Sequence, residues 1–292
     1  MKLFQALFAV LIGSGALAMG CAEEADDLDM PDDPALASPA RTPLGGPAGS
    51  TGTNNFPPPD CMGNRGNLYT ATQSTFATYD ITDDEWWIAN NAANNALLST
   101  SGGRTAIKYA ARCALPATVT VNAQVGATQY SYPGQGLLTT TPGWLTAPLP
   151  LTAAQDLFGC MLAHLNAFGV EVPINLSGPS VTNTAGHDAN FTWEEALWVA
   201  KITSGPTQKT TFAFHVWPLD DLVQCEAYVE QLTNRVCGGF TGNCGLTVRS
   251  DRATVCTETS AGWYCDVTPT TTLPAIKTRL KVTDVETLYD CP

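Results

Sequence analysis

Residues 151–177 change their hydrophobic period part-way along, and this change constrains the fold more than any other feature of the chain. The first part repeats apolar side chains at steps of three and four, which predicts an amphipathic helix. These positions are Ala154, Leu157, Phe158, Met161, Leu162, Leu165 and Phe168. Thr152 and Gln155 have the spacing of a capping box at its start. Residues 170–176 then alternate, which predicts a strand with Pro173 at an edge or facing solvent.

Local patterns along the rest of the chain predict further helices and strands. A helix is expected to open at Thr82 and to be broken by Gly102 and Gly103. Other helices are predicted at 104–112, 192–201 and 220–236, and strands at 117–125, 127–132, 211–217, 253–256, 262–267 and 276–282. Trp144 should anchor the long loop at 132–150. Because helices and antiparallel strands are interspersed without a regular βαβ period, we expect an α+β fold with about four helices.

The first twenty residues have the pattern of an export signal. Lys2 precedes an apolar run, 3–17, that is too short to span a bilayer and is typical of a secretory leader. The run ends in LAMGC, which resembles a bacterial lipobox except that Ala18 holds the place usually taken by Leu. We therefore expect 1–20 to be a lipoprotein signal peptide and Cys21 to be lipidated, which would anchor the protein to a membrane. The alternative is an ordinary signal peptide cut near the same place.

Residues 21–60 have the composition of a tether between the anchor and a folded domain at 61–292. Acidic residues crowd its first third and prolines follow, so this segment cannot bury enough apolar surface to fold alone. The alternative is a loop packed on the domain. From residue 61 onward the chain has 19 acidic and 12 basic residues with no basic cluster, which argues against a nucleic-acid partner. No second apolar run is long enough to span a membrane.

Nine cysteines follow Cys21, and in an exported protein they should pair. Four are concentrated in the C-terminal region: Cys237, Cys244, Cys256 and Cys265. Their spacing lacks the short knuckle of a zinc site, so we expect disulfides of open connectivity and no metal. Cys113 and Cys160 are predicted to pair with each other, since Cys160 lies off the apolar stripe of its helix. The alternative role for Cys160 is a nucleophile assisted by His164, one helical turn away.

The histidines supply the weak candidates for catalysis. His187 lies in a polar loop with Glu194 and Glu195 nearby, and His215 lies in a predicted strand. With a carboxylate such as Glu194, the two histidines could bind zinc or act as acid and base in a secreted hydrolase. No zinc-protease, nucleophile-elbow or nucleotide-binding motif supports this hypothesis, and we expect no cofactor. The simpler interpretation is one solvated loop histidine and one strand histidine at the edge of the core.

Aromatic residues suggest a binding role as well as a core role. Core packing is the default for tryptophan, because its side chain buries a large apolar area. A few of the tryptophans could instead line a groove for a carbohydrate or a peptide. The candidates are Trp86, Trp87, Trp144, Trp193, Trp198 and Trp217.

Four short segments resemble a family of exported proteins from myxobacteria. They are KYAARCALP at 108–116, YPGQGL at 132–137, WL at 144–145 and CMLAHLNAFGV at 160–170. The family patterns are KY…CALP, F.G..GL.P.W and ACLLAR.NA.GV, so the resemblance covers roughly residues 100–180. The family has no established activity and transfers no catalytic residue. It implies an exported or lipid-anchored protein of a soil or predatory bacterium, and it places Cys113 and Cys160 at recurring positions. His164 replaces the usual arginine, which argues against a family-wide catalytic role for this residue.

These observations favour a cell-envelope lipoprotein. We expect it to be exported and either lipid-anchored in the outer membrane or secreted. Its disulfide-bonded α+β domain is expected to bind a carbohydrate or protein ligand, and an enzymatic role is not favoured. The alternatives are a secreted hydrolase that uses His187 or His215 with carboxylates, and a structural envelope protein.

Overall fold

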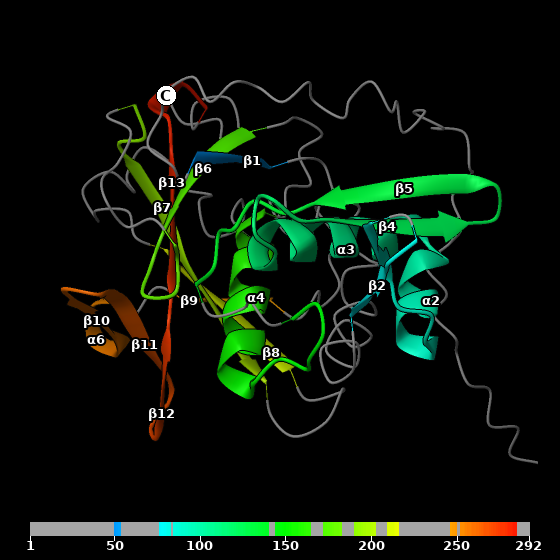
Figure 1. Ribbon diagram of the computed structural model, residues 1–292. Coiled ribbons are helices and arrows are strands. Elements are labelled where there is room, and N and C mark those ends of the chain that lie inside the picture. The colour runs from blue at the N-terminus through cyan, green and yellow to red at the C-terminus, as the bar shows by residue number, and fades with distance from the viewer. Residues whose placement is uncertain are drawn as a thin grey trace, which may run out of the picture. The chain divides into compact units, whose positions relative to one another are not determined.

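The computed structural model describes residues 50–53, 76–82, 84–139, 144–164, 172–182, 190–202, 209–215, 246–249 and 252–284. These residues belong to one compact unit, Pro43–Pro292. They form helices and mainly antiparallel strands, and two cysteine pairs are joined as disulfides, so the expected α+β class is confirmed (Figure 1). Among them, no helix is long and apolar enough to cross a membrane.

The largest sheet has six strands in the order β1-β6-β13-β7-β8-β9. Their bounds are Ser50–Thr53 (β1), Val172–Ser177 (β6), Ile276–Leu280 (β13), Trp193–Ile202 (β7), Lys209–His215 (β8) and Leu246–Arg249 (β9). Neighbouring strands are antiparallel except β8 and β9, which run parallel. The predicted strand at 170–176 is β6. Pro173 lies beyond the part of β6 that pairs with β13, so its missing N–H interrupts no hydrogen bond to that strand.

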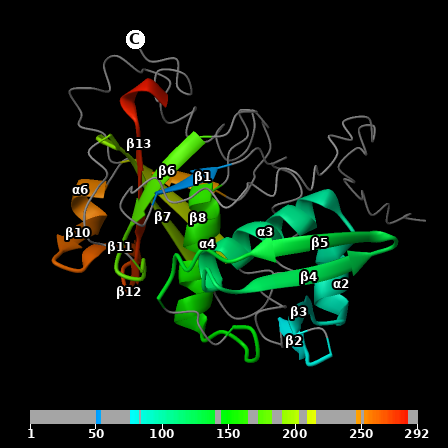
Figure 2. The same cartoon turned by 45° about the horizontal axis from the view of Figure 1, so that its top comes forward.

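One helix, α4 (Leu151–His164), lies against β7 and β13 (Figures 1 and 2). All but its first two residues are buried, because the sheet covers one side and α3 (Ser101–Ala114) packs on another. The predicted helix is therefore confirmed over Leu151–His164, but its expected one-sided burial is wrong, since a helix that is buried all round belongs to the core. Gly159 faces the sheet: a Cβ at this position would lie 3.4 Å from the carbonyl oxygen of Trp198, an ordinary van der Waals contact.

Gln155 of α4 has a different role from the predicted capping box. Its side-chain Oε1 accepts a hydrogen bond from the backbone N–H of Ile202, at 3.1 Å. The bond satisfies a buried donor at the end of β7, which would otherwise cost about 1–3 kcal/mol. Gln155 therefore joins the helix to the sheet and does not cap its own helix.

A second sheet has the order β2-β3-β4-β5. Its strands are Ala77–Asp80 (β2), Glu85–Ile88 (β3), Thr120–Val125 (β4) and Thr128–Pro133 (β5), and only β3 and β4 run parallel. The predicted hairpin is confirmed as β4 and β5, which turn at Gly126 with a φ of 59°. The helix predicted to open at Thr82 is wrong, because Glu85–Ile88 is a strand and α2 (Ala92–Leu98) begins only after Asn91, whose side chain accepts from the N–H of Asn94.

The glycine pair that was expected to break a helix lies inside α3. This helix begins after Thr100, whose Oγ1 accepts from the N–H of Gly103 at 3.0 Å. A Cβ at Gly103 would lie 2.0 Å from the carbonyl oxygen of Leu97. Gly103 is thus required where α2 and α3 meet, and its lack of a side chain permits the contact.

A third sheet, β10-β11-β12, packs on the side of β7 that faces away from α4 (Figure 2). Its strands are Cys256–Thr259 (β10), Gly262–Thr268 (β11) and Thr271–Pro274 (β12). β7 is consequently buried on both faces, and the prediction of a helix at 192–201 is wrong. The strand predicted at 253–256 is also wrong, because α6 (Arg252–Val255) precedes β10. The strands predicted at 211–217, 262–267 and 276–282 correspond to β8, β11 and β13.

The expected anchoring role of Trp144 is confirmed. Its side chain is fully buried and stacks on Phe76, with 3.8 Å between the ring centroids. The helix predicted at 220–236 lies outside the described residues.

Candidate functional site

Cys113 of α3 and Cys160 of α4 form the predicted disulfide, with 6.1 Å between their Cα atoms. Both residues and His164 are completely buried. The His164 Nδ1 atom lies 3.8 Å from the sulfur of Cys113 and 3.9 Å from that of Cys160. The three side chains therefore form one compact group in the core, where α3 meets α4.

This group does not have the arrangement of a cysteine nucleophile. Its sulfur atoms are bonded to each other, so neither is a thiolate. His164 Nδ1 is 2.7 Å from the backbone oxygen of Cys160, a contact that requires Nδ1 to carry the proton. The protonated Nδ1 cannot accept a proton or a metal ion on the side that faces the sulfurs. We therefore assign the group a structural role, which corrects the alternative reading of Cys160 as a nucleophile.

A second disulfide joins Cys256 and Cys265, which are directly paired across β10 and β11. It closes the hairpin that covers Leu197 and Val199 of β7. Cys237, Cys244 and Cys21 lie outside the described residues, and their predicted roles stay predictions.

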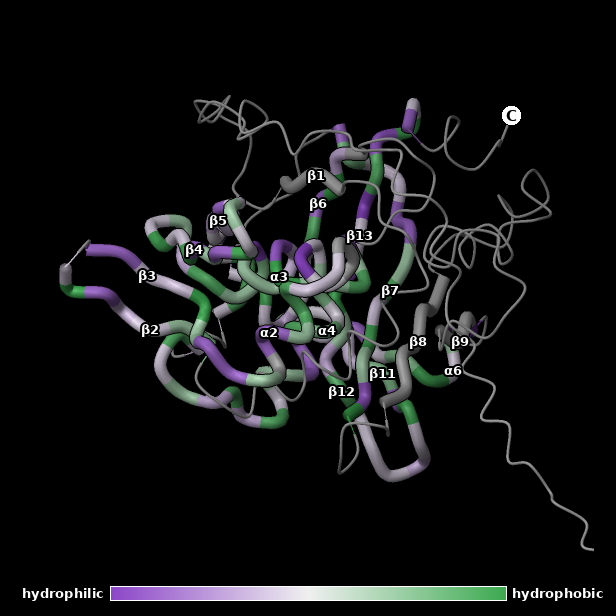
Figure 3. The backbone as a smooth tube through the Cα atoms, turned by 90° about the vertical axis from the view of Figure 1, so that its right-hand side faces the viewer, coloured by the Kyte–Doolittle hydropathy of each residue, from purple (hydrophilic) through white to green (hydrophobic). Residues whose placement is uncertain are grey.

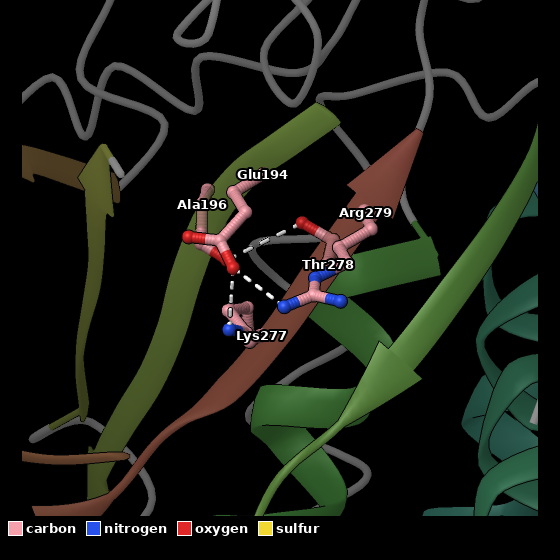
Figure 4. A network of polar contacts seen from close by, with 5 residues as sticks. All are labelled: Glu194, Ala196, Lys277, Thr278 and Arg279. Atoms are coloured by element: carbon pink, nitrogen blue, oxygen red, sulfur yellow. Dashed lines mark hydrogen bonds and ion pairs between the residues drawn. The ribbon is translucent and has the colours of Figure 1, made fainter. Parts of the chain in front are cut away.

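Glu194 is held by two cations on the neighbouring strand β13 (Figure 4). Its Oε1 atom lies 2.7 Å from Lys277 Nζ and 2.6 Å from Arg279 Nη2. Partial burial raises the pKa of Glu194, but the hydrogen bonds and charges of Lys277 and Arg279 outweigh this effect and hold the pKa below its usual range. Glu194 is therefore a stable carboxylate, which suits an ion pair better than a proton donor at neutral pH.

The adjacent Glu195 lies in a different environment. The ladder between β7 and β13 shifts register here, pairing Thr278 with Ala196 and Arg279 with Glu194, so that Glu195 is the extra residue of a bulge. The Glu195 side chain is fully buried and accepts a hydrogen bond from Thr278 Oγ1 at 2.7 Å. The same hydroxyl accepts from the indole N–H of Trp198 at 2.9 Å. The bulge thus separates two consecutive glutamates, one in an ion pair and one in the core.

The proposed pairing of His187 with His215 is not tested by the described residues. His187 lies outside them. The backbone of His215 belongs to β8 and pairs with Ala196, two residues along β7 from Glu194. The sequence correctly placed His215 on a strand, but it assigned Glu194 to a helix, and it gave no sign of the two cations that bind Glu194.

The structure separates the tryptophans that were candidates for a groove. Trp144 and Trp198 are fully buried, and Trp86 and Trp193 are partly buried against the main core, so these four pack in or on the core. Trp217 lies outside the described residues. Among the described candidates, only Trp87 lies on the face of the second sheet that is opposite Val121.

The face of this sheet opposite Val121 carries a row of polar side chains beside Trp87. Trp87 pairs with Asn122, which pairs with Ser131, and residues paired across strands share a face. Asn122 Nδ2 donates to Glu85 Oε2 at 3.0 Å, and Ser131 Oγ donates to Asn122 Oδ1 at 2.7 Å. The opposite face contributes Val121 and other apolar residues to the core. Figure 3 shows hydrophilic and hydrophobic residues mixed along these strands.

We call Glu85, Trp87, Asn122 and Ser131 the polar row. Trp87 is half-buried and Asn122 is 7% exposed, and the buried indole N–H of Trp87 finds no acceptor within the described part of the chain. The row thus combines one aromatic ring with a carboxylate, an amide and a hydroxyl that are already fixed by hydrogen bonds. Sequence analysis named Trp87 as a candidate but missed its polar neighbours, because Glu85 had been assigned to the start of a helix. The alternation of Val121, Ala123 and Val125 was the signal that placed Asn122 on the face opposite these apolar residues.

Comparison with known proteins adds no assignment, because no family model, no curated protein and no solved structure matches the chain.

Proposed function

We propose that this chain is a cell-envelope lipoprotein whose folded part binds a carbohydrate outside the cytoplasm through the polar row. In this proposal 1–20 is a lipoprotein signal peptide and Cys21 is the lipidated residue. The expected tether at 21–60 is shortened to residues before Ser50, because Ser50–Thr53 forms β1 of the six-stranded sheet and so belongs to the folded part, 50–292. Outer-membrane anchoring or secretion follows from the leader and from the resemblance to exported proteins of myxobacteria. The folded part would be one disulfide-bonded domain with about four helices, of the α+β class.

The disulfides support export of the folded part. Disulfides persist in oxidising compartments and are rare in the cytoplasm. One of the two observed pairs, Cys113–Cys160, lies in the core between two helices, so the fold is built around it. A protein that depends on such a bond suits the bacterial envelope or the extracellular medium.

The single observation that carries the carbohydrate proposal is the placement of Trp87 beside Glu85, Asn122 and Ser131 on one sheet face. The C–H faces of a sugar ring can stack on an indole, while its hydroxyl groups donate to carboxylates and exchange hydrogen bonds with amides. The three polar side chains are held in position by one another, so little conformational entropy is lost when a ligand binds. The row has no cation, which favours a neutral polysaccharide over an acidic one.

The proposal is tested by co-sedimentation of the folded part with insoluble polysaccharides, namely cellulose, chitin and peptidoglycan. We expect at least one of them to retain the protein, and Trp87→Ala to weaken retention about tenfold or more, since a central aromatic contact in an interface is typically worth about 2 kcal/mol. Tyr264→Ala is the matched control, because Tyr264 is also a half-buried aromatic but lies on β11. Equal loss in the two variants, or no binding by the wild type, would exclude the polar row as a carbohydrate site.

The anchor is tested separately by labelling cells with radioactive palmitate. The wild type is expected to take up the label and Cys21→Ser to lose it, because the acyl chains are attached at this residue. Retention of the label by Cys21→Ser would show that the lipoprotein proposal is wrong, whatever the outcome of the binding experiment.

The hydrolase alternative has no observation in its favour among the described residues. Glu194 is engaged by Lys277 and Arg279, and the pKa of Glu194 is lowered, which opposes a role as a general acid. A structural envelope protein without a ligand would give no retention on any polysaccharide in the same experiment.

A further inference from the structure

Counting only the residues that the structure describes, the ion pair on β7 and β13 carries an excess of positive charge. Lys277 and Arg279 share one carboxylate, that of Glu194, and both bind the same oxygen, Oε1. The side chains of Lys277 and Arg279 are only 8% and 13% exposed. A buried charge without a partner costs several kcal/mol, so a second anion would stabilise this arrangement. The surplus is notable in a chain with a formal net charge of −13.

Both cations have donors that remain available. A guanidinium has five N–H donors and an ammonium has three. In the described part of the chain, Arg279 donates through Nη2 only, and its buried Nε has no acceptor. Lys277 uses one donor, toward Glu194. The fork of Arg279 is therefore partly unoccupied on a side chain that is held in place by its ion pair.

The neighbouring strand adds two neutral polar residues. On β6, Asn175 pairs with Arg279 and Ser177 pairs with Lys277, and paired residues share a face. Asn175 is 3% exposed, and Ser177 is half-buried. Amide and hydroxyl groups can donate to an oxyanion without adding charge. The Glu194 side chain is 33% exposed, so solvent reaches this member of the group. Figure 4 shows its carboxylate lying between Lys277 and Arg279.

We propose that Lys277, Arg279, Asn175 and Ser177 form a binding site for a phosphate group, either free or esterified. Arginine suits this ligand because its planar fork matches two phosphate oxygens, and lysine adds a point charge. A phosphate carries between one and two negative charges near neutral pH, enough to neutralise the surplus. The site lies on the six-stranded sheet and is independent of the polar row, so either proposal can fail without the other.

Isothermal titration of the folded part with inorganic phosphate tests the site. We expect saturable binding that weakens about tenfold or more in Arg279→Gln, equivalent to about 1.4 kcal/mol. Glu194→Gln should bind phosphate more tightly than the wild type, because it removes the competing carboxylate. Arg252→Gln is the matched control, since Arg252 is a half-buried arginine that lies over Trp263, and its affinity should not change.

The direction of the Glu194→Gln effect keeps the test independent of folding, because loss of structure cannot strengthen binding. Glycerol phosphate distinguishes the sources: binding as tight as that of inorganic phosphate indicates an esterified ligand, and much weaker binding indicates the free ion. No saturable phosphate binding by the wild type would overturn the proposal. So would an Arg279→Gln variant with unchanged affinity, or weaker binding by Glu194→Gln.

Discussion

The Cys113–Cys160 disulfide should contribute more to stability than the Cys256–Cys265 disulfide. The first has a sequence separation of 47 residues and the second a separation of 9. The chain-entropy relation gives about 4 kcal/mol for the longer loop and about 2.6 kcal/mol for the shorter one. All four cysteines are buried, so truncation to alanine leaves a small cavity worth about 1 kcal/mol more in each variant. The expected losses are therefore about 5 and about 3.6 kcal/mol.

Guanidinium unfolding of the wild type and of two double variants measures this difference. The variants are Cys113→Ala with Cys160→Ala, and Cys256→Ala with Cys265→Ala. Fluorescence of the buried Trp144 and Trp198 reports on the core during unfolding. A loss of about 5 kcal/mol is a large part of the 5–15 kcal/mol that stabilises a typical protein, so the first variant should unfold at much lower denaturant. If the second variant lost as much as the first, the assignment of Cys113–Cys160 as the main cross-link would be refuted.

Two further predictions follow from single side chains. The difference in unfolding free energy between the wild type and Glu194→Gln should be constant above about pH 5 and shrink as the pH falls. The reason is that the pKa of Glu194 is lowered in the folded state, and its ion pairs are lost when the carboxylate is protonated. Urea unfolding from pH 7 to 3 measures this difference, and a difference that grows in acid would contradict the prediction. Gly103→Ala should cost about 3 kcal/mol, because the new Cβ meets a backbone oxygen at 2.0 Å. Gly126→Ala is the control, because Gly126 has a positive φ but a Cβ there would meet no atom within 4 Å. It should cost only about 1 kcal/mol in the same assay. Equal losses in the two variants would show that the contact with Leu97 is not the reason for glycine at position 103.

Sequence patterns correctly predicted those elements that have one buried face and one exposed face. In β4, Val121 and Ala123 lie in the core while Thr120 and Gln124 are exposed, so alternation was visible and the hairpin was found. The Cys113–Cys160 pair was also found, because one cysteine lay off the apparent stripe of a predicted helix. Both successes depended on local contrast between neighbouring residues.

The same reasoning failed for elements that are buried on every side. In β7, Ala196 and Trp198 pack on the main core, while Leu197 and Val199 pack on the second core. Without polar residues on one face, the strand lacked alternation, and the capping-box spacing at Thr192 favoured a helix instead. In α4, small and polar residues between the large apolar side chains suggested a one-sided stripe, but these residues are buried as well.

Long-range contacts limited what could be predicted of the sites. Glu194 meets Lys277 and Arg279 across 83 and 85 positions of sequence, because β13 returns to lie beside β7. A bulge at Glu195 then decides which of two adjacent glutamates faces these cations. Neither the partner strand nor a one-residue shift of register can be read from one sequence.

The indole N–H resonance of Trp87 provides the most direct test of the central claim. Nitrogen–proton correlation spectra of the folded part would be recorded while soluble oligosaccharides from the retained polysaccharide are added. We predict a saturable shift of the Trp87 signal with no change at Trp263, which lies on β11 of the third sheet. An unmoved Trp87 signal under conditions where the sugar binds would contradict the claim that the polar row is the binding site.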